Sequence, residues 1–283
     1  MELVKGNSNI QPKSGCEIMS ENQPFEIGST NWRIGRNWGL AHPDHTCYCD
    51  GRVVQITTVG TKMVRLGIGY DPKTFIINDF PITYPWMVGY ISSIDTFKYG
   101  RFEFQFVLPV GQNLWPAIWL TDGKTWPPEI DIVEGWTDEK SLKHPKHAYR
   151  KYLWNLIPEC CTNKIFPGLV TGNCMENKGG QSYKNIWGGT NAKYLETDFL
   201  KANGDPNVCV LEWMPNKITM WYNGHKVMEE TDPEMLKWFN ASEGMEVHLN
   251  NYVTNSFSLD NFLNLPGNDS SCLKIIDFKY LSW

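Results

Sequence analysis

Short runs that alternate apolar and polar residues recur along this chain, and they constrain its fold more than any other feature. In the run 101–107, three phenylalanines alternate with polar residues and fall on one face of an extended strand. The Asn-Gly pair at 223–224 lies between two apolar runs and predicts a hairpin turn. One helix is predicted, over 232–239, where Asp and Pro begin a helical pattern. Because the strands follow one another without interleaved helices, the sequence predicts an all-β sandwich of two antiparallel sheets.

The predicted strands are short and spread over most of the chain. They cover residues 53–58, 64–69, 90–94, 100–108, 117–120, 130–133, 208–213, 218–222, 246–251 and 275–281. The segment 140–201 lacks this pattern and is rich in Gly, Asn, Lys and Cys, so we expect long loops there. No repeat or linker divides the chain, and residues 1–283 are predicted to form a single domain.

The composition excludes several classes of protein. Asp and Glu number 31 against 26 Lys and Arg, and the resulting net charge of −5 argues against a nucleic-acid partner. No apolar run approaches the roughly 18–20 residues needed to cross a bilayer, so no membrane partner is expected. Residues 1–9 lack the apolar core of a signal peptide. The eight cysteines include no C-x-x-C pair, which argues against a zinc ribbon and predicts a mixture of free thiols and one or two disulfides.

Three carboxylates lie within six residues of an otherwise apolar run, at Glu129, Asp131 and Glu134. On a regular strand Glu129 and Asp131 share one face, whereas strict alternation turns Glu134 toward the apolar face, where an unpaired charge is costly. One extra residue near Ile132 and Val133, a β-bulge, would return Glu134 to the face of the other two carboxylates. The sequence therefore predicts a bulged strand that carries three acids on one face.

Acids crowded in this way are typical of glycosidase sites. Their pKa values are driven apart, which suits one nucleophilic carboxylate and one protonated general acid. Two glutamates converging from one strand fit the roughly 5–5.5 Å separation of retaining enzymes, against about 6.5–9.5 Å for inverting ones. A calcium site or a solvated strand face would explain the acids but not the tryptophans around them. Those tryptophans, which offer flat faces to sugar rings, are Trp115, Trp119, Trp126 and Trp136.

Residues 129–134 read Glu-Ile-Asp-Ile-Val-Glu and resemble the E-x-D-x-x-E signature of glycoside hydrolase family 16. Segments 97–104, 114–119, 210–224 and 275–280 resemble other strands of that family, so the resemblance spans about residues 89–281. It implies a β-jelly-roll with a concave substrate cleft. The spacing of two residues between Asp and the second Glu is similar to the bulged branch, which includes laminarinases, agarases, porphyranases and carrageenases.

The resemblance also implies a role for each matching residue. Glu129 would be the nucleophile of a retaining double displacement, and Asp131 would assist it. Glu134 would act first as the general acid and then as the general base. Trp115, Trp119 and Trp126 would line sugar subsites on the non-reducing side.

Two weaker site assignments come from the C-terminal third of the chain. Asn250 and Asn251 lie on a predicted strand where one of the two amides would face sugar hydroxyls if the alternation is regular, and Asn250 is the assigned candidate. Asp277 resembles a ligand of a structural calcium ion found in some members of the family. No other cofactor is expected.

The expected function is an endo-acting retaining hydrolase, with a β-1,3- or mixed-linkage β-glucan favoured as substrate. A red-algal sulfated galactan is the alternative, since the basic segment 140–151 could pair with sulfate. A non-catalytic carbohydrate-binding jelly roll is the second alternative. The expected partner is a polysaccharide, the expected state is a monomer, and a polymer substrate implies a secreted, extracellular protein.

Overall fold

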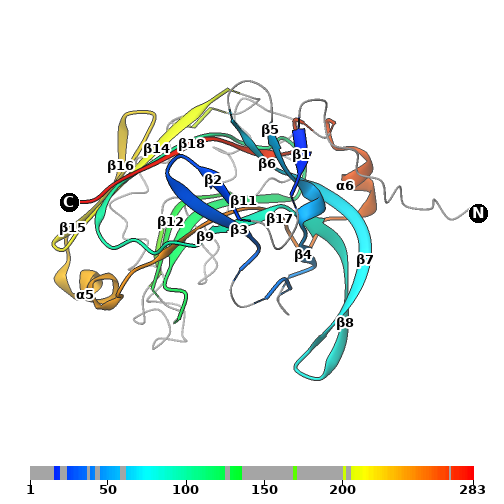
Figure 1. Cartoon of the computed structure of the whole chain (residues 1–283), viewed down its shortest axis with the longest axis horizontal. Helices are drawn as coiled ribbons and strands as arrows, with labels where there is room; N and C mark the ends of the chain where they lie inside the picture. The colour runs from blue at the N-terminus through cyan, green and yellow to red at the C-terminus, as the bar shows by residue number, and fades with distance from the viewer. Residues whose placement is uncertain are drawn as a thin grey trace, which may run out of the picture.

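A sandwich of two large antiparallel sheets, with a small third sheet beside it, makes up the computed structural model (Figure 1). The structure describes residues 16–19, 24–36, 39–41, 45–57, 62–124, 128–135, 168–170, 200–201, 205–267 and 269–283. The two large antiparallel sheets confirm the predicted all-β sandwich. Among the described residues, no helix is both long and apolar enough to cross a membrane.

The strand order in each sheet follows from the backbone pairing. The eight-stranded sheet runs β1 (Cys16–Ile18), β5 (Val54–Thr57), β6 (Val64–Leu66), β18 (Leu273–Leu281), β10 (Gly100–Val107), β14 (Asn207–Met214), β15 (Lys217–Tyr222) and β16 (His225–Glu230). The seven-stranded sheet runs β13 (Gly168–Val170), β12 (Glu129–Glu134), β11 (Leu114–Thr121), β17 (Glu246–Val253), β9 (Tyr90–Ser93), β3 (Thr30–Ile34) and β2 (Phe25–Ile27). The small sheet holds β4 (Cys47–Cys49), β8 (Phe80–Val88) and β7 (Ile68–Ile77). In the described residues the helical segments are η1 (Gly51–Val53), α5 (Pro233–Ala241) and α6 (Leu259–Leu263).

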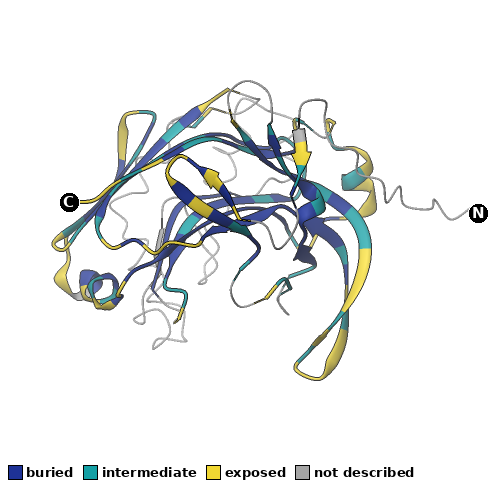
Figure 2. Ribbon diagram, in the orientation of Figure 1, coloured by how far each residue is buried: buried dark blue, intermediate teal, exposed yellow. Residues whose placement is uncertain are grey.

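The main core lies between the two large sheets and is built by alternation along their strands (Figure 2). Phe102, Phe104 and Phe106 of β10 are fully buried, as their spacing predicts. On the facing sheet, Ile118 of β11 and Leu249 of β17 belong to the same apolar cluster. Because these residues point inward, their neighbours along each strand point to the opposite face of the sheet.

The turn and the helix predicted from the sequence are both present. Asn223 and Gly224 have φ angles of 48° and 85° between β15 and β16, the left-handed conformation that an Asn-Gly hairpin turn requires. Helix α5 (Pro233–Ala241) begins one residue after the predicted run 232–239 begins and ends two residues beyond it. The segment 140–201, expected to be loops, contributes the strand β13, which pairs with β12.

The hairpin of β7 and β8, which projects from one end of the sandwich in Figure 1, was missed by the sequence analysis. Prolines at 72, 81 and 85 interrupt its pattern. Tyr70 pairs with Trp86, but the next pair joins Lys73 to Tyr84, so the register shifts where Pro72 lies. Proline is tolerated in a sheet at such an irregularity.

Four of the cysteines are buried and are not joined in disulfide bonds, namely Cys47, Cys49, Cys209 and Cys272. For these four the expectation of free thiols is confirmed. Cys160, Cys161, Cys174 and the side chain of Cys16 lie outside the part of the chain that the structure describes.

Candidate active site

Strand β12 contains the predicted bulge. Glu134 lies opposite Ala117 of β11 and Val133 opposite Ile118, but the next pair joins Asp131 to Trp119. Ile132 is therefore the extra residue of β12. Ile132 and Val133 both enter the core between the sheets, fully buried, and the alternation resumes with Glu134 on the other face.

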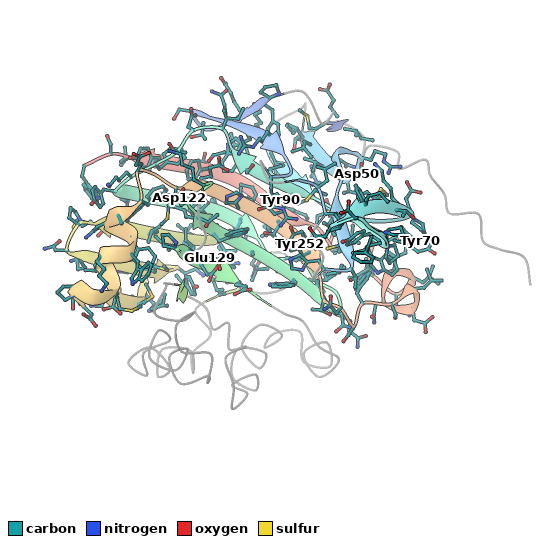
Figure 3. All side chains as sticks on the ribbon, turned by 90° about the horizontal axis from the view of Figure 1, so that it is seen from below. Asp50, Tyr70, Tyr90, Asp122, Glu129 and Tyr252 are labelled. Atoms are coloured by element: carbon teal, nitrogen blue, oxygen red, sulfur yellow. The ribbon has the colours of Figure 1, made fainter. Side chains whose placement is uncertain are left out.

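The three carboxylates share the face of the seven-stranded sheet that points away from the core, which we call the polar face. Glu129, Asp131 and Glu134 are only 8 %, 3 % and 3 % exposed. The residues paired with them on β11 and β17 also point alternately to the core and to the polar face. The polar face therefore continues across these strands to β9. Figure 3 shows Glu129 on the same sheet as Tyr90 and Tyr252, which extend this face.

Both ends of β12 are tied to β11. The Thr121 hydroxyl donates to the carbonyl of Pro128 over 3.0 Å, just before Glu129. The Gly135 amide donates to the carbonyl of Pro116 over 3.0 Å, just after Glu134. These bonds fix the backbone on either side of the bulge.

Two of the predicted tryptophans hold polar residues in place. The Trp115 indole N–H donates to Oε1 of Glu134 over 3.0 Å. The Trp119 indole N–H donates to Oδ1 of Asn250 over 2.8 Å, and the Asn250 amide approaches the Trp115 carbonyl at 3.4 Å. Asn250 faces the polar side, as predicted, while Asn251 points inward and donates to the carbonyls of Leu66 and Ser271. The subsite roles of Trp115, Trp119 and Asn250 stay predictions.

A group of polar side chains that the sequence analysis missed extends the polar face toward β3. Arg33 donates to Oε2 of Glu246 over 2.7 Å and to the Ser92 hydroxyl over 3.0 Å. The ring of His248 stacks on Trp119, with centroids 4.5 Å apart and planes inclined by 28°. These contacts connect the far strands of the sheet to the strand beside the carboxylates.

The signal for part of this group is present in β17. Glu246, His248 and Asn250 alternate there with the buried apolar residues Val247 and Leu249. A strand with one polar and one apolar face is expected at the surface of a site rather than in the middle of a core. The alternation that places Asn250 on the polar face therefore also places Glu246 and His248 there.

An aromatic and cationic cluster lies at the Trp115 end of the polar face. The Arg36 guanidinium is 5.5 Å from the centre of the Tyr90 ring and 5.9 Å from that of Tyr252, within cation–π range. The His45 ring lies 5.4 Å from that of Trp115 and 5.0 Å from that of Tyr252. Such a combination of flat rings and donors suits a sugar ring with its hydroxyl groups.

His248 is fully buried, and its environment favours the neutral imidazole. Desolvation lowers the pKa of His248 well below its usual value, and the positive charges of Arg33 and Arg36 lower it further. Its Nδ1 lies 2.8 Å from the Tyr90 hydroxyl. His248 is therefore a neutral structural partner of Trp119 at neutral pH.

This burial predicts a pH dependence of stability. Below about pH 6.5 an unfolded His takes up a proton, whereas buried His248 does not, so the unfolded state gains stability as the pH falls. We expect His248 to lower the free energy of unfolding by up to about 1.4 kcal/mol per pH unit between roughly pH 6.5 and its folded pKa. Urea denaturation at pH 7, 6 and 5 measures this slope. His248→Gln should flatten it and the exposed control His225→Gln should not; equal slopes in all three proteins would contradict the assignment.

The remaining predicted residues are either outside the described ranges or far from the carboxylates. Trp126 and Trp136 lie outside the described residues, as does the basic segment 140–151. Asp277 lies in β18, where its Oδ2 is 3.2 Å from the Lys279 ammonium. Within the described ranges no group of three or more His, Cys, Asp or Glu side chains could hold a metal ion. A calcium ion held largely by backbone carbonyls near Asp277 stays a prediction.

Comparison with known proteins agrees with the resemblance in the sequence. The model of the XgeA-like, catalytic GH16 domain matches residues 90–248, more than half of the chain. The curated endo-1,3-1,4-beta-glycanase EglC of Rhizobium meliloti is 43 % identical over 54 residues, which are 18 % of this chain and only 12 % of that relative.

Solved structures share the fold over nearly the whole chain. Porphyranase B of Zobellia galactanivorans is 14 % identical with a TM-score of 0.56, covering 95 % of this chain and 91 % of its own. A GH16 protein of the Bacteroides ovatus mixed-linkage glucan locus, in complex with a G4G4G3G product, is 16 % identical with a TM-score of 0.54, covering 93 % and 98 %. These likenesses confirm the β-jelly-roll sandwich. The match of the catalytic GH16 domain model over residues 90–248 shows that the chain belongs to glycoside hydrolase family 16.

Proposed function

We propose that this protein is an endo-acting glycoside hydrolase that cleaves a β-linked polysaccharide with retention of configuration. The observation that carries the proposal is the bulge of β12, which brings Glu129, Asp131 and Glu134 to one face of the sheet. A binding protein has no need of three acids held together at the cost of a disrupted strand. Membership of family 16 supports the same chemistry.

The proposed reaction is a double displacement. Glu129 attacks the anomeric carbon while Glu134, as general acid, gives a proton to the departing glycosidic oxygen. Water then attacks the glycosyl-enzyme ester; Glu134 takes a proton from it, and Glu129 leaves as a carboxylate. Asp131, between the two on the same face, orients Glu129. The indole of Trp115 holds Glu134 by its donated hydrogen bond.

A β-1,3- or mixed-linkage β-glucan is the favoured substrate. The supporting observation is local: the stretch shared with an endo-1,3-1,4-beta-glycanase is 43 % identical. A sulfated galactan is the second candidate, supported by the sequence of the basic segment 140–151. A polysaccharide is thus the proposed partner, and we propose a monomeric protein that acts outside the cell, where such polymers occur.

The test is release of reducing sugar from a panel of laminarin, barley mixed-linkage glucan, agarose, porphyran and carrageenan. We expect release from one of the two glucans, with a rapid fall in viscosity that marks internal cleavage. Release only from a galactan would contradict the favoured glucan substrate but would support the proposed glycoside hydrolysis. No release from any polymer, with sugar binding retained, would favour the non-catalytic jelly roll.

A further inference from the structure

The bulge that turns Glu134 toward the polar face leaves one backbone group to be satisfied inside the core. Ile132 has no opposite residue in the pairing of β12 with β11, and within the described residues the pairing of β12 with β13 extends only from Glu129 to Asp131. Ile132 is fully buried between the sheets. A buried carbonyl outside the strand ladder costs free energy unless a donor reaches it.

That donor comes from the opposite sheet. The hydroxyl of Tyr222, at the end of β15, donates a hydrogen bond to the carbonyl oxygen of Ile132. Tyr222 is 2 % exposed and lies opposite Cys209 of β14, so its ring is fixed within the core. The bond therefore links the extra residue of the bulge to a rigid strand on the far side of the sandwich.

The hydroxyl is a constant donor. Burial raises the pKa of Tyr222 well above its usual value, and the nearby Cys209 and Asp131 raise it further. The phenol is therefore protonated at neutral pH. A neutral phenol also satisfies the carbonyl without bringing a charge into the core.

We propose that Tyr222 is a positioning residue, which locks the bulge at Ile132 and thereby aims Glu134 at the reacting bond. The competing backbone arrangement is the regular strand, in which Glu134 turns toward the core. Satisfying the Ile132 carbonyl stabilises the bulge relative to that arrangement. That Tyr222 aims Glu134 for catalysis rests on the proposed function. That Tyr222 stabilises the bulge of β12 does not depend on it.

The test uses Tyr222→Phe, which removes only the hydroxyl. Tyr48→Phe is the matched control, because Tyr48 is also fully buried and donates to a backbone carbonyl, that of Asp71 over 2.8 Å, in the small sheet. Thermal unfolding should show midpoints lowered by a few degrees in both variants. A loss of activity that follows from lower stability alone would then appear in both variants.

Two measurements separate positioning from stability. Hydrogen exchange followed by mass spectrometry should show the peptide 129–135 exchanging about ten-fold faster in Tyr222→Phe and unchanged in Tyr48→Phe. The kcat/KM for the polymer should fall about 10- to 100-fold in Tyr222→Phe, since small displacements of catalytic groups have effects of this size. An aryl glycoside whose leaving group departs without a proton should lose less than about three-fold, because it does not need Glu134 as an acid.

Replacing Tyr222 by p-aminophenylalanine, which restores a donor at the ring, should recover the polymer activity to within about three-fold of the parent. If Tyr222→Phe does not fold, the p-aminophenylalanine variant replaces it in the exchange measurement: its weaker N–H donor should leave the peptide 129–135 exchanging about two-fold faster than in the parent, with no change in Tyr48→Phe. Unchanged exchange at 129–135, or equal losses on polymer and aryl glycoside, would overturn the proposal. If the parent cleaves no polymer, the proposed function fails, while exchange at 129–135 still decides whether Tyr222 holds the bulge.

Discussion

Replacing Glu129 by Gln is expected to lower the rate of polymer cleavage by about 10⁴-fold or more, with the fold intact. Gln is close in size to Glu but cannot form the glycosyl ester, and loss of a nucleophile has effects of this order in other enzymes. Glu129 lies on the polar face rather than in the core, so the free energy of unfolding should change little. Initial rates of reducing-sugar release, measured beside a urea unfolding curve, test both statements.

Glu26→Gln is the matched control, because Glu26 is an exposed glutamate on β2 of the same sheet. It should keep the activity of the parent. A 2-deoxy-2-fluoro glycoside with a good leaving group should label the parent enzyme at Glu129, because the fluorine slows both formation and hydrolysis of the ester whereas the leaving group speeds only its formation. A label on another carboxylate, or a loss of only ten-fold in Glu129→Gln, would show that Glu129 is not the nucleophile.

The bulge and its carboxylates could be predicted from the sequence because the constraint is local. A charged residue placed by alternation on an apolar face requires either a partner or a shift of register, and only a shift brings Glu134 to the other acids. The predicted hairpin at Asn223–Gly224 is similarly local, since two adjacent residues determine the turn. Each feature depends on a few consecutive residues.

The contacts across the sheets could not be predicted in this way. Arg33 meets Glu246 across 213 positions of sequence, and Tyr222 meets Ile132 across 90. No local pattern selects such partners, because they depend on which strands become neighbours and in which register. The hairpin of β7 and β8 was missed for a different reason: prolines disfavour a central strand, yet Pro72 and Pro85 lie at the shift of register and Pro81 pairs with Ile76 near the turn.

Replacing Glu134 by Gln is expected to lower the activity on the polymer far more than the activity on an aryl glycoside with a good leaving group. The kcat/KM for the polymer should fall by about 10²- to 10⁴-fold, the usual contribution of a general acid. The kcat/KM for an aryl glycoside with a dinitrophenolate leaving group should stay within about ten-fold of the parent, because this group departs without a proton. Steady-state rates on both substrates, with Glu26→Gln as control, measure the difference.

Azide provides a second test of the same residue and of the stereochemistry. With the general base removed, the glycosyl ester at Glu129 accumulates, and azide can attack it without losing a proton. The aryl glycoside should then turn over faster with azide and give a glycosyl azide of the β configuration, which nuclear magnetic resonance distinguishes from the α form. An α-glycosyl azide would exclude retention. Equal losses on both substrates without acceleration by azide would assign Glu134 a structural role, leaving the acid to be found among other residues of the polar face.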